Sequence, residues 1–154
     1  MFLLIVAVAV FAVDRITKTL AQRNLPLDKP VPVIDNLVYL THTQNAGAAF
    51  SMGRSFGNFY LVFAILVSLG IVLFYRRLGR GQAWVRLGLG MILGGALGNA
   101  FDRLLTQSVT DFVDLRWWPV FNVADSCIVV GTIIVIADGL LRSRQPARAD
   151  AGPD

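Results

Sequence analysis

Glutamate is absent from this 154-residue sequence, so all ten acidic residues are aspartates. Charged residues of both signs make up only 16% of the chain, against about a quarter in a typical soluble domain. The single cysteine, Cys127, excludes an internal disulfide framework. With only one histidine as well, His42, a Cys/His zinc site is excluded, and we expect neither a metal nor another cofactor.

Hydrophobic residues make up 55% of the sequence and gather in four long blocks. A membrane-spanning helix needs roughly 17–25 residues, and each block reaches that length with its flanks. The predicted spans are about 2–21, 58–75, 85–103 and 121–141. Because no basic segment precedes the first block, we interpret it as a retained helix and not a cleaved signal peptide. The sequence therefore predicts an all-α membrane protein, a four-transmembrane-helix bundle, with residues 1–154 forming a single domain.

Arginines at the ends of the blocks predict how the chain crosses the membrane. The connection between the second and third blocks carries Arg76, Arg77, Arg80 and Arg86 without any acidic residue, and the tail 142–154 is also rich in arginine. The positive-inside rule places both on the cytoplasmic side, together with both termini. The net charge of +4 thus reflects membrane topology, and we expect no nucleic-acid partner.

The two remaining connections face outward in this topology. The first has prolines followed by a β-branched and aromatic run from Val31 to Thr43, which predicts a small extended or β-like extracytoplasmic platform. The second, about 103–119, alternates aspartates with Phe112, Trp117 and Trp118, a composition typical of an interfacial loop or short helix. Asp114 in this segment is predicted to be an ordinary solvated residue.

Polar residues within the blocks are energetically unfavourable in lipid, and in this topology nearly all of them lie at the outer membrane boundary. Asp14 and Lys18 are one helical turn apart and are predicted to pair. Asp138 is the exception, because it lies near the inner end of the fourth block, beside Arg142. Charged groups at such depths usually face a wet cavity and serve a function. The converging residues are Asp14, Lys18, Asn99, Asp102, Arg103, Asp111, Asn122 and Asp125.

Asp111 and Asp125 form the pair with the clearest chemistry. Two close carboxylates do not both ionise easily, so one keeps a proton while the other stays charged. The charged carboxylate can accept a proton from water as it attacks a carbonyl, and the protonated one can supply a proton to the leaving amine. This is the chemistry of an aspartic protease.

Four motifs now match a known family in order: "DRITK" from Asp14, "TQNAGAAFS" from Thr43, "GGALGNAFDRL" from Gly94, and "VTDFVD" from Val109 with "FNVADS". The chain resembles the bacterial lipoprotein signal peptidases (signal peptidase II) over nearly its whole length. The resemblance implies an aspartic endopeptidase of the bacterial inner membrane, with its active site at the outer leaflet. It further implies cleavage of diacylglyceryl-modified prolipoproteins before the lipidated cysteine, inhibition by globomycin, and contact with membrane lipid. We expect the protein to act as a monomer.

The resemblance assigns catalysis to Asp111 and Asp125. The further positions that match the family's motifs are implied to bind substrate or support the site: Asp14, Lys18, Asn45, Gly95, Asn99, Asp102, Arg103 and Asn122. Arg103 could stabilise the dyad or hold a lipid phosphate.

Other interpretations remain open for the same residues. Asp125 could simply cap a helix, and Gly90, Gly94 and Gly98 form GxxxG steps explained by helix packing. His42 and Cys127 are interpreted as an exposed and a buried structural residue. Three rival functions are a proton-coupled carrier or channel, a serine/lysine peptidase using Lys18 with Ser51 or Ser126, and a structural subunit.

Overall fold

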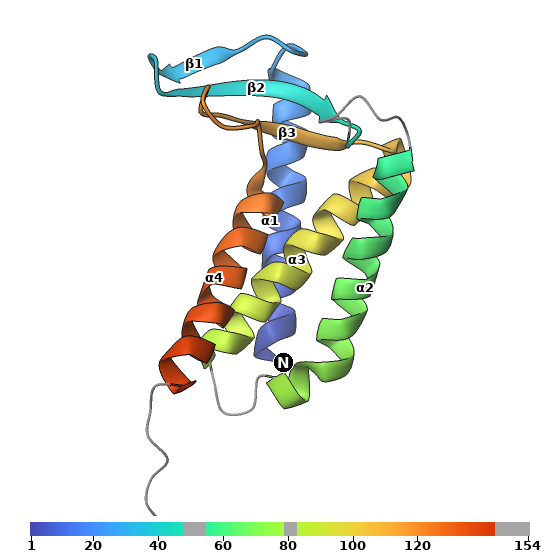
Figure 1. Ribbon diagram of the computed structural model, residues 1–154. Coiled ribbons are helices and arrows are strands. Elements are labelled where there is room, and N and C mark those ends of the chain that lie inside the picture. The colour runs from blue at the N-terminus through green and yellow to red at the C-terminus, as the bar shows by residue number, and fades with distance from the viewer. Residues whose placement is uncertain (48–54, 79–82, 144–154) are drawn as a thin grey trace, which may run out of the picture.

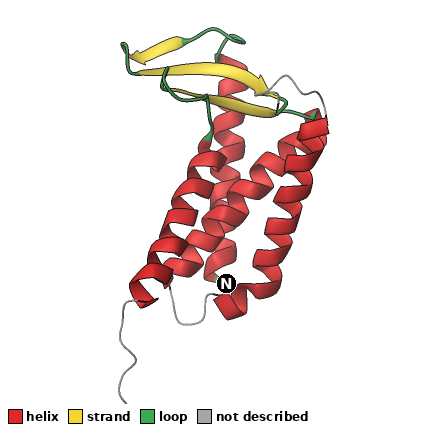
Figure 2. Ribbon diagram, viewed as in Figure 1, coloured by secondary structure: helices red, strands yellow, loops and turns green. Residues whose placement is uncertain are grey.

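The computed structural model describes residues 1–47, 55–78 and 83–143. In these ranges the chain forms four helices and a three-stranded antiparallel sheet (Figures 1 and 2). The sheet lies across one end of the helices, and the N-terminus lies at the opposite end. In chain order the elements are α1 (Phe2–Asn24), β1 (Val31–Ile34), β2 (Val38–Asn45), α2 (Ser55–Leu78), α3 (Ala83–Thr106), β3 (Val109–Asp114) and α4 (Val123–Ser143).

The four helices correspond to the four predicted spans. The first three extend beyond their predicted spans by a few residues, and α4 begins and ends slightly later than predicted. Among the described residues, α4 has the length and composition that a membrane span requires, and α2 contains a shorter apolar stretch, Phe59–Tyr75. Asp138 pairs with Arg142 near the end of α4, with 2.6 Å between Oδ2 and Nε. Ser51, Arg80 and the tail beyond Ser143 lie outside the described residues.

Glycines on α3 let its neighbours approach closely. A Cβ atom at Gly90 would lie 2.8 Å from the carbonyl oxygen of Leu3, and one at Gly94 would lie 2.5 Å from that of Ala7. These contacts are shorter than real Cβ atoms make, so only glycine allows α1 to pack at this distance. The predicted packing role of Gly90 and Gly94 is confirmed, in keeping with the use of small residues between helices in membranes.

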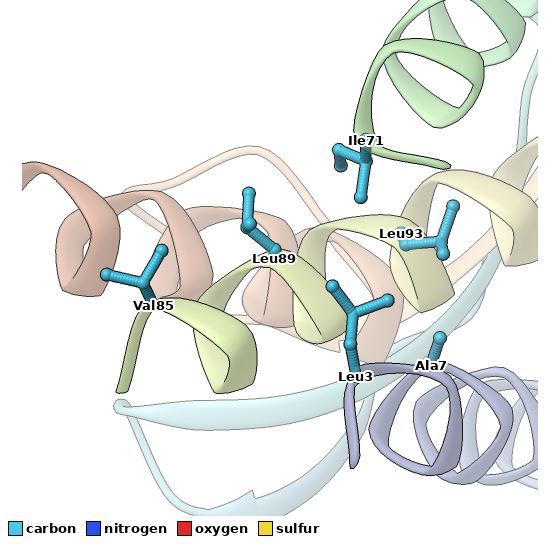
Figure 3. Close-up of a cluster of buried hydrophobic side chains, with 6 residues drawn as sticks. All are labelled: Leu3, Ala7, Ile71, Val85, Leu89 and Leu93. Atoms are coloured by element: carbon cyan, nitrogen blue, oxygen red, sulfur yellow. The ribbon is translucent and has the colours of Figure 1, made fainter. Parts of the chain in front are cut away.

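An apolar cluster joins three of the helices at the end away from the sheet (Figure 3). It contains no polar side chain, whereas the buried charges of α1 and α3, Asp14, Lys18 and Asp102, lie toward the sheet end of their helices. The two ends of the helices are therefore chemically different. The six clustered residues are Leu3, Ala7, Ile71, Val85, Leu89 and Leu93.

The sheet has the order β1-β2-β3, so segments from both predicted outer connections pair with each other. The extended platform is confirmed as β1 and β2. The expected interfacial loop or short helix after α3 is wrong over β3, where Asp111 pairs with Thr43 of β2. A left-handed residue makes this possible: Gln107 has φ 58° and donates its N–H to the carbonyl of Arg103 at 3.0 Å, which ends α3 and reverses the chain. The loop is confined to residues 115–122.

Two residues of the sheet that were expected to be exposed are buried. Asp114 is 6% exposed and accepts hydrogen bonds from the Thr41 hydroxyl and the Arg116 backbone N–H, both at 2.8 Å. His42 is buried because the segment that follows α1 crosses β2, where Asp28 donates its N–H to the carbonyl of His42. The predictions of a solvated Asp114 and an exposed His42 are wrong. Cys127 is half-buried.

Candidate active site

Asn122 and Asp125 form a reciprocal cap at the start of α4. The backbone N–H of Asp125 donates to Asn122 Oδ1 at 2.9 Å, and the backbone N–H of Asn122 donates to Asp125 Oδ2 at 3.2 Å. This is a capping box in which aspartate takes the place of the usual glutamate. The N-cap residue is therefore Asn122, and Asp125 is its partner one turn later. The helix terminus fixes the position of the Asp125 carboxylate.

Asn122 also connects Asp125 to Asp111. Its side-chain Nδ2 donates to Asp111 Oδ1 at 2.6 Å, so one residue holds both carboxylates of the predicted pair. Asp111 comes from β3 and is only 2% exposed. Its other oxygen, Oδ2, accepts a hydrogen bond from Asn45 Nδ2 of the adjacent strand at 3.0 Å. The structure thus brings Asn45, Asp111, Asn122 and Asp125 together from three separate elements.

Asn99 reaches the same cluster from α3. Its Nδ2 donates to Asp125 Oδ1 at 2.7 Å. Its Oδ1 accepts from Lys18 Nζ at 2.8 Å and from Asn122 Nδ2 at 3.2 Å. Because Lys18 can only donate, it determines which end of the Asn99 amide faces Asp125. Lys18 therefore acts on the site through Asn99 and does not contact either carboxylate of the pair.

Lys18 is itself held in a buried ionic cluster. Its Nζ lies 2.9 Å from Asp14 Oδ2, which confirms the predicted pair, and 2.9 Å from Asp102 Oδ2. With Asn99, these acceptors match the three hydrogens of the ammonium group. Arg15 also pairs with Asp102, a contact that the sequence did not predict. The motif "DRITK" contains Arg15, but its local pattern does not reveal a partner 87 positions away.

Asp14 and Gly95 position the start of α4. Asp14 Oδ1 accepts the backbone N–H of Ala124 at 3.0 Å, so a side chain of α1 satisfies a free N–H of another helix. A Cβ atom at Gly95 would lie 2.5 Å from the carbonyl oxygen of Ala124. Gly95 therefore sets the approach of α3 to α4, and the space at this glycine is filled by the α4 backbone. Gly98 similarly lies against the carboxylate of Asp14.

A cavity of about 350 Å³ opens beside these residues, between α2, α3, α4 and the end of β2. Asp125 lines it, whereas Asp111 lies behind the cavity wall. Arg103 stands over the ring of Tyr60, with 5.2 Å from Cζ to the ring centroid, and shares the same wall. Polar groups thus gather at one part of the cavity, and apolar side chains line the remainder. The apolar members include Phe63, Ala64, Val67, Ile92, Ala96 and Ile128.

The environment of Asp111 favours its protonated form. Burial raises the pKa of Asp111 to about 6, the hydrogen bond from Asn45 opposes this rise, and the neighbouring charge of Asp125 adds to it. Asp111 therefore holds its proton to a higher pH than an ordinary aspartate does. Among the described residues, no group of three or more His, Cys, Asp or Glu side chains is arranged to hold a metal ion.

Comparison with known proteins now identifies the family. Residues 6–141 match the family model described as signal peptidase (SPase) II. The chain belongs to the signal peptidase II family. It is 45% identical over 140 residues to the lipoprotein signal peptidase of Mycobacterium avium (strain 104), covering 87% of this chain and 76% of that one. It is 39% identical over 145 residues to that of Moorella thermoacetica, covering 94% and 97%.

A solved structure shares the fold of this signal peptidase II. A bacterial membrane enzyme determined by the in meso method at 2.3 Å resolution matches it with a TM-score of 0.87 and 26% identity, over 97% of this chain and 94% of that one. The predicted resemblance to lipoprotein signal peptidases is thereby confirmed. The alternative of a proton-coupled carrier finds no support in these comparisons.

The serine/lysine alternative also lacks support in the geometry of this signal peptidase II. The Ser126 hydroxyl donates to the backbone carbonyl of Asn122 at 3.1 Å, within its own helix. The Nζ of Lys18 contacts Asp14, Asp102 and Asn99, and Ser126 is not among these partners. Ser51 lies outside the described residues.

Proposed function

We propose that this signal peptidase II is a membrane aspartic endopeptidase whose catalytic pair is Asp111 and Asp125. The observation that carries the proposal is the position of Asn122, which hydrogen-bonds both carboxylates beside a cavity that Asp125 lines. Two carboxylates held by a common donor are the arrangement that lets one stay ionised while the other keeps a proton. Among the described residues that line this cavity, Asp125 is the one carboxylate, and Asn122 links it to Asp111 behind the wall.

The different surroundings of the two carboxylates suggest their roles. Asp125 lies in the first turn of α4 and accepts hydrogen bonds from Asn99 Nδ2 and the Asn122 backbone N–H, and both features stabilise a negative charge. Asp111 has its pKa raised to about 6 by burial. We therefore assign the resting charge to Asp125 and the resting proton to Asp111.

Peptide hydrolysis then proceeds without a covalent intermediate. Asp125 accepts a proton from a water molecule as the water oxygen bonds to the scissile carbonyl carbon. Asp111 donates a hydrogen bond to the carbonyl oxygen, and it gives its proton to the amine when the C–N bond breaks. The proton on Asp125 then returns to Asp111, which restores the resting pair. Arg103, at the cavity wall, offers a positive charge that stabilises the negative charge of the intermediate.

Asn45 is proposed to contact the substrate backbone at the mouth of the cavity. Its Oδ1 accepts the N–H of Gly47, and its Nδ2 holds Asp111, so both ends of the amide are oriented. Lys18, Asp14, Asp102, Gly95 and Asn99 support the site by fixing the start of α4 and the Asp125 carboxylate. These are positioning residues, because they act by holding Asp125, Asn99 or the backbone of α4 in place.

We further propose that all four helices span the bacterial inner membrane as one domain. Large apolar side chains remain exposed at their centres, for example Leu66 at 60% and Ile133 at 60%, which is unfavourable in water but suits lipid. The sheet then lies at the outer leaflet, and both termini lie in the cytoplasm. The relatives are named lipoprotein signal peptidases, and we propose diacylglyceryl-modified prolipoproteins as the substrates. The bundle is complete in one chain, so a monomer suffices.

Separate Asp111→Asn and Asp125→Asn variants test the catalytic assignment. Each is expected to lose cleavage of a diacylglyceryl-modified prolipoprotein in liposomes by at least about 10³-fold, while still binding it. Asp138→Asn is the matched control, because Asp138 pairs with Arg142 far from the cavity and should keep wild-type activity. Near wild-type cleavage by either folded variant would disprove the pair. Loss of cleavage in Ser126→Ala, with both aspartate variants active, would favour the serine/lysine mechanism.

A further inference from the structure

A second cavity, of about 400 Å³, lies on another side of Asp125. It is formed by the loop after β3 and the first turns of α4. Its walls are apolar, and Trp117 and Trp118 pack edge to face with 5.9 Å between ring centroids. The apolar lining consists of Leu115, Trp117, Trp118, Phe121, Val129 and Val130.

Apart from the indole N–H groups of its tryptophans, the polar side chains that line this cavity are Asp125 and Ser126. Asp125 belongs to the network of the catalytic pair, and the Ser126 hydroxyl already donates to the Asn122 carbonyl at 3.1 Å. The cavity therefore offers hardly any polar partner to a ligand away from its Asp125 end. By contrast, the first cavity presents Asn45, Asn99 and Arg103. The two cavities suit different parts of one substrate.

Asp125 is the lining residue that the two cavities share. A peptide bond cleaved at Asp125 therefore lies next to both cavities, so the substrate segments on its two sides can occupy different cavities. In the proposed reaction, the residue that follows the scissile bond carries two acyl chains. An apolar cavity that begins at the catalytic carboxylate is continuous with the place where such a residue must lie.

The surroundings of the second cavity place it at the edge of the bilayer. Trp117 is 74% exposed and Trp118 is 57% exposed, and tryptophans gather at the depth of lipid headgroups. Val129 and Val130 lie on α4, the helix with the length and composition of a span, and both are exposed. A hydrocarbon chain can therefore enter this cavity sideways from the lipid without crossing water.

We propose that the cavity between residues 115–121 and α4 binds an acyl chain of the lipid on the substrate's modified cysteine. This inference rests on the proposed function, since it takes Asp125 as the point of cleavage. Binding there would hold the scissile bond at Asp125 through contacts remote from the reacting atoms, which is how enzymes use binding energy for positioning. It would also make cleavage depend on the length of the acyl chain.

Photocrosslinking tests the location of the chain directly. A diacylated lipopeptide with a photoreactive group in one acyl chain is bound to the full-length Asp111→Asn variant in liposomes, and the labelled residues are found by mass spectrometry. We expect labels on residues 115–121 and on Val129 or Val130. Labels on Phe63 and Val67, in the first cavity, would overturn the proposal. Equal labelling by a photoreactive phospholipid that the lipopeptide does not displace would also overturn it, because a membrane lipid would then be the occupant.

Chain-length selectivity provides a second test, measured as the ratio of kcat/KM for substrates with long and with short acyl chains. Val129→Trp fills the cavity and should lower this ratio roughly tenfold. Ile133→Trp is the matched control, since Ile133 is equally exposed on α4 but lies outside the cavity, and should leave the ratio unchanged. An unchanged ratio in Val129→Trp would overturn the proposal.

Trp118→Ala covers the case in which Val129→Trp does not fold. It removes a wall of the cavity and should lower the same ratio, and an unchanged ratio would again overturn the inference. The crosslinking result does not require catalysis, so it is independent of the assigned pair. If Asp111→Asn and Asp125→Asn kept full activity, the proposed function would fail while the acyl-chain labels could still appear, and the two failures would be distinguishable.

Discussion

Replacing Asp111 by asparagine should make the folded protein more stable relative to wild type as the pH rises, although the proposed function needs the carboxylate. Asp111 is 2% exposed, and burial raises its pKa from 3.8 to about 6 in the folded state. Its ionisation is therefore harder in the folded protein than in the unfolded chain. Asparagine has a similar shape and does not titrate, so it removes this penalty.

The pKa difference sets the magnitude of the effect. A change from 3.8 to about 6 corresponds to about 3 kcal/mol at 1.36 kcal/mol per pKa unit. Because the folded pKa is the higher one, the contribution of Asp111 to stability is fully present below 3.8 and is lost as the pH rises through about 6. The stability difference between Asp111→Asn and wild type should thus grow by about 3 kcal/mol across this window and stay level above it.

The pH dependence, and not the absolute stability, is the quantity to measure. The new side-chain amide in Asp111→Asn would place its own N–H₂ group near Asn45 or Asn122, which costs about 1 kcal/mol at every pH. Thermal unfolding in detergent, followed by tryptophan fluorescence between about pH 4 and pH 8, separates the two effects. A difference that stays flat across this range would show that burial of Asp111 does not oppose its charge.

Asp114 provides a control of opposite sign on the same strand. Burial alone would raise its pKa, but hydrogen bonds from the Arg116 backbone N–H and the Thr41 hydroxyl lower the pKa overall. Its carboxylate therefore contributes stability above the unfolded pKa, and this contribution is lost as the pH falls through the folded pKa. Asp114→Asn should be destabilised at neutral pH and approach wild type in acid. If the stability difference from wild type changed with pH in the same direction for both variants, the pH dependence would not come from the individual carboxylates.

Two further substitutions test the support of the site. Lys18→Met leaves Asp14 and Asp102 without their shared ammonium, so it should destabilise the fold by about 3–5 kcal/mol in thermal unfolding, and adding Asp14→Asn should recover part of this loss. Gly95→Val pushes against the Ala124 carbonyl and should cost about 1–3 kcal/mol together with most of the cleavage activity. Gly139→Ala has nothing within 4 Å of the new Cβ and should match or slightly exceed wild-type stability.

The helices could be predicted from the sequence because their signal is local. Each apolar block is long enough to define a helix by itself, and the predicted spans agree with α1 to α4 within a few residues. The pair of Asp14 and Lys18 could also be predicted, since both residues lie on one helix, one turn apart. The candidate site residues were found from their depth along these helices and from the motifs that resemble the family.

The sheet and the cross-helix contacts could not be predicted in the same way. β3 pairs with β2 between residues that lie 68 positions apart, for example Asp111 and Thr43. The composition of 103–119, with aspartates and tryptophans, is that of an interface, and the strand β3 within it is only six residues long, without an alternation of apolar and polar residues. The burial of Asp114 and the pairing of Arg15 with Asp102 follow from packing between distant elements, which leaves no periodic trace in the sequence.

The start of α4 explains why so many polar side chains share one place. A helix terminus leaves free N–H groups, and here Asn122, Asp125 and Asp14 accept three of them. The same terminus orients the proposed catalytic pair, since Asn122 holds Asp111 and Asn99 holds Asp125. A loop would let these carboxylates drift apart, whereas a capped helix against Gly95 does not. The cap is therefore part of the proposed catalytic geometry, and changes that loosen it should lower activity before they unfold the protein.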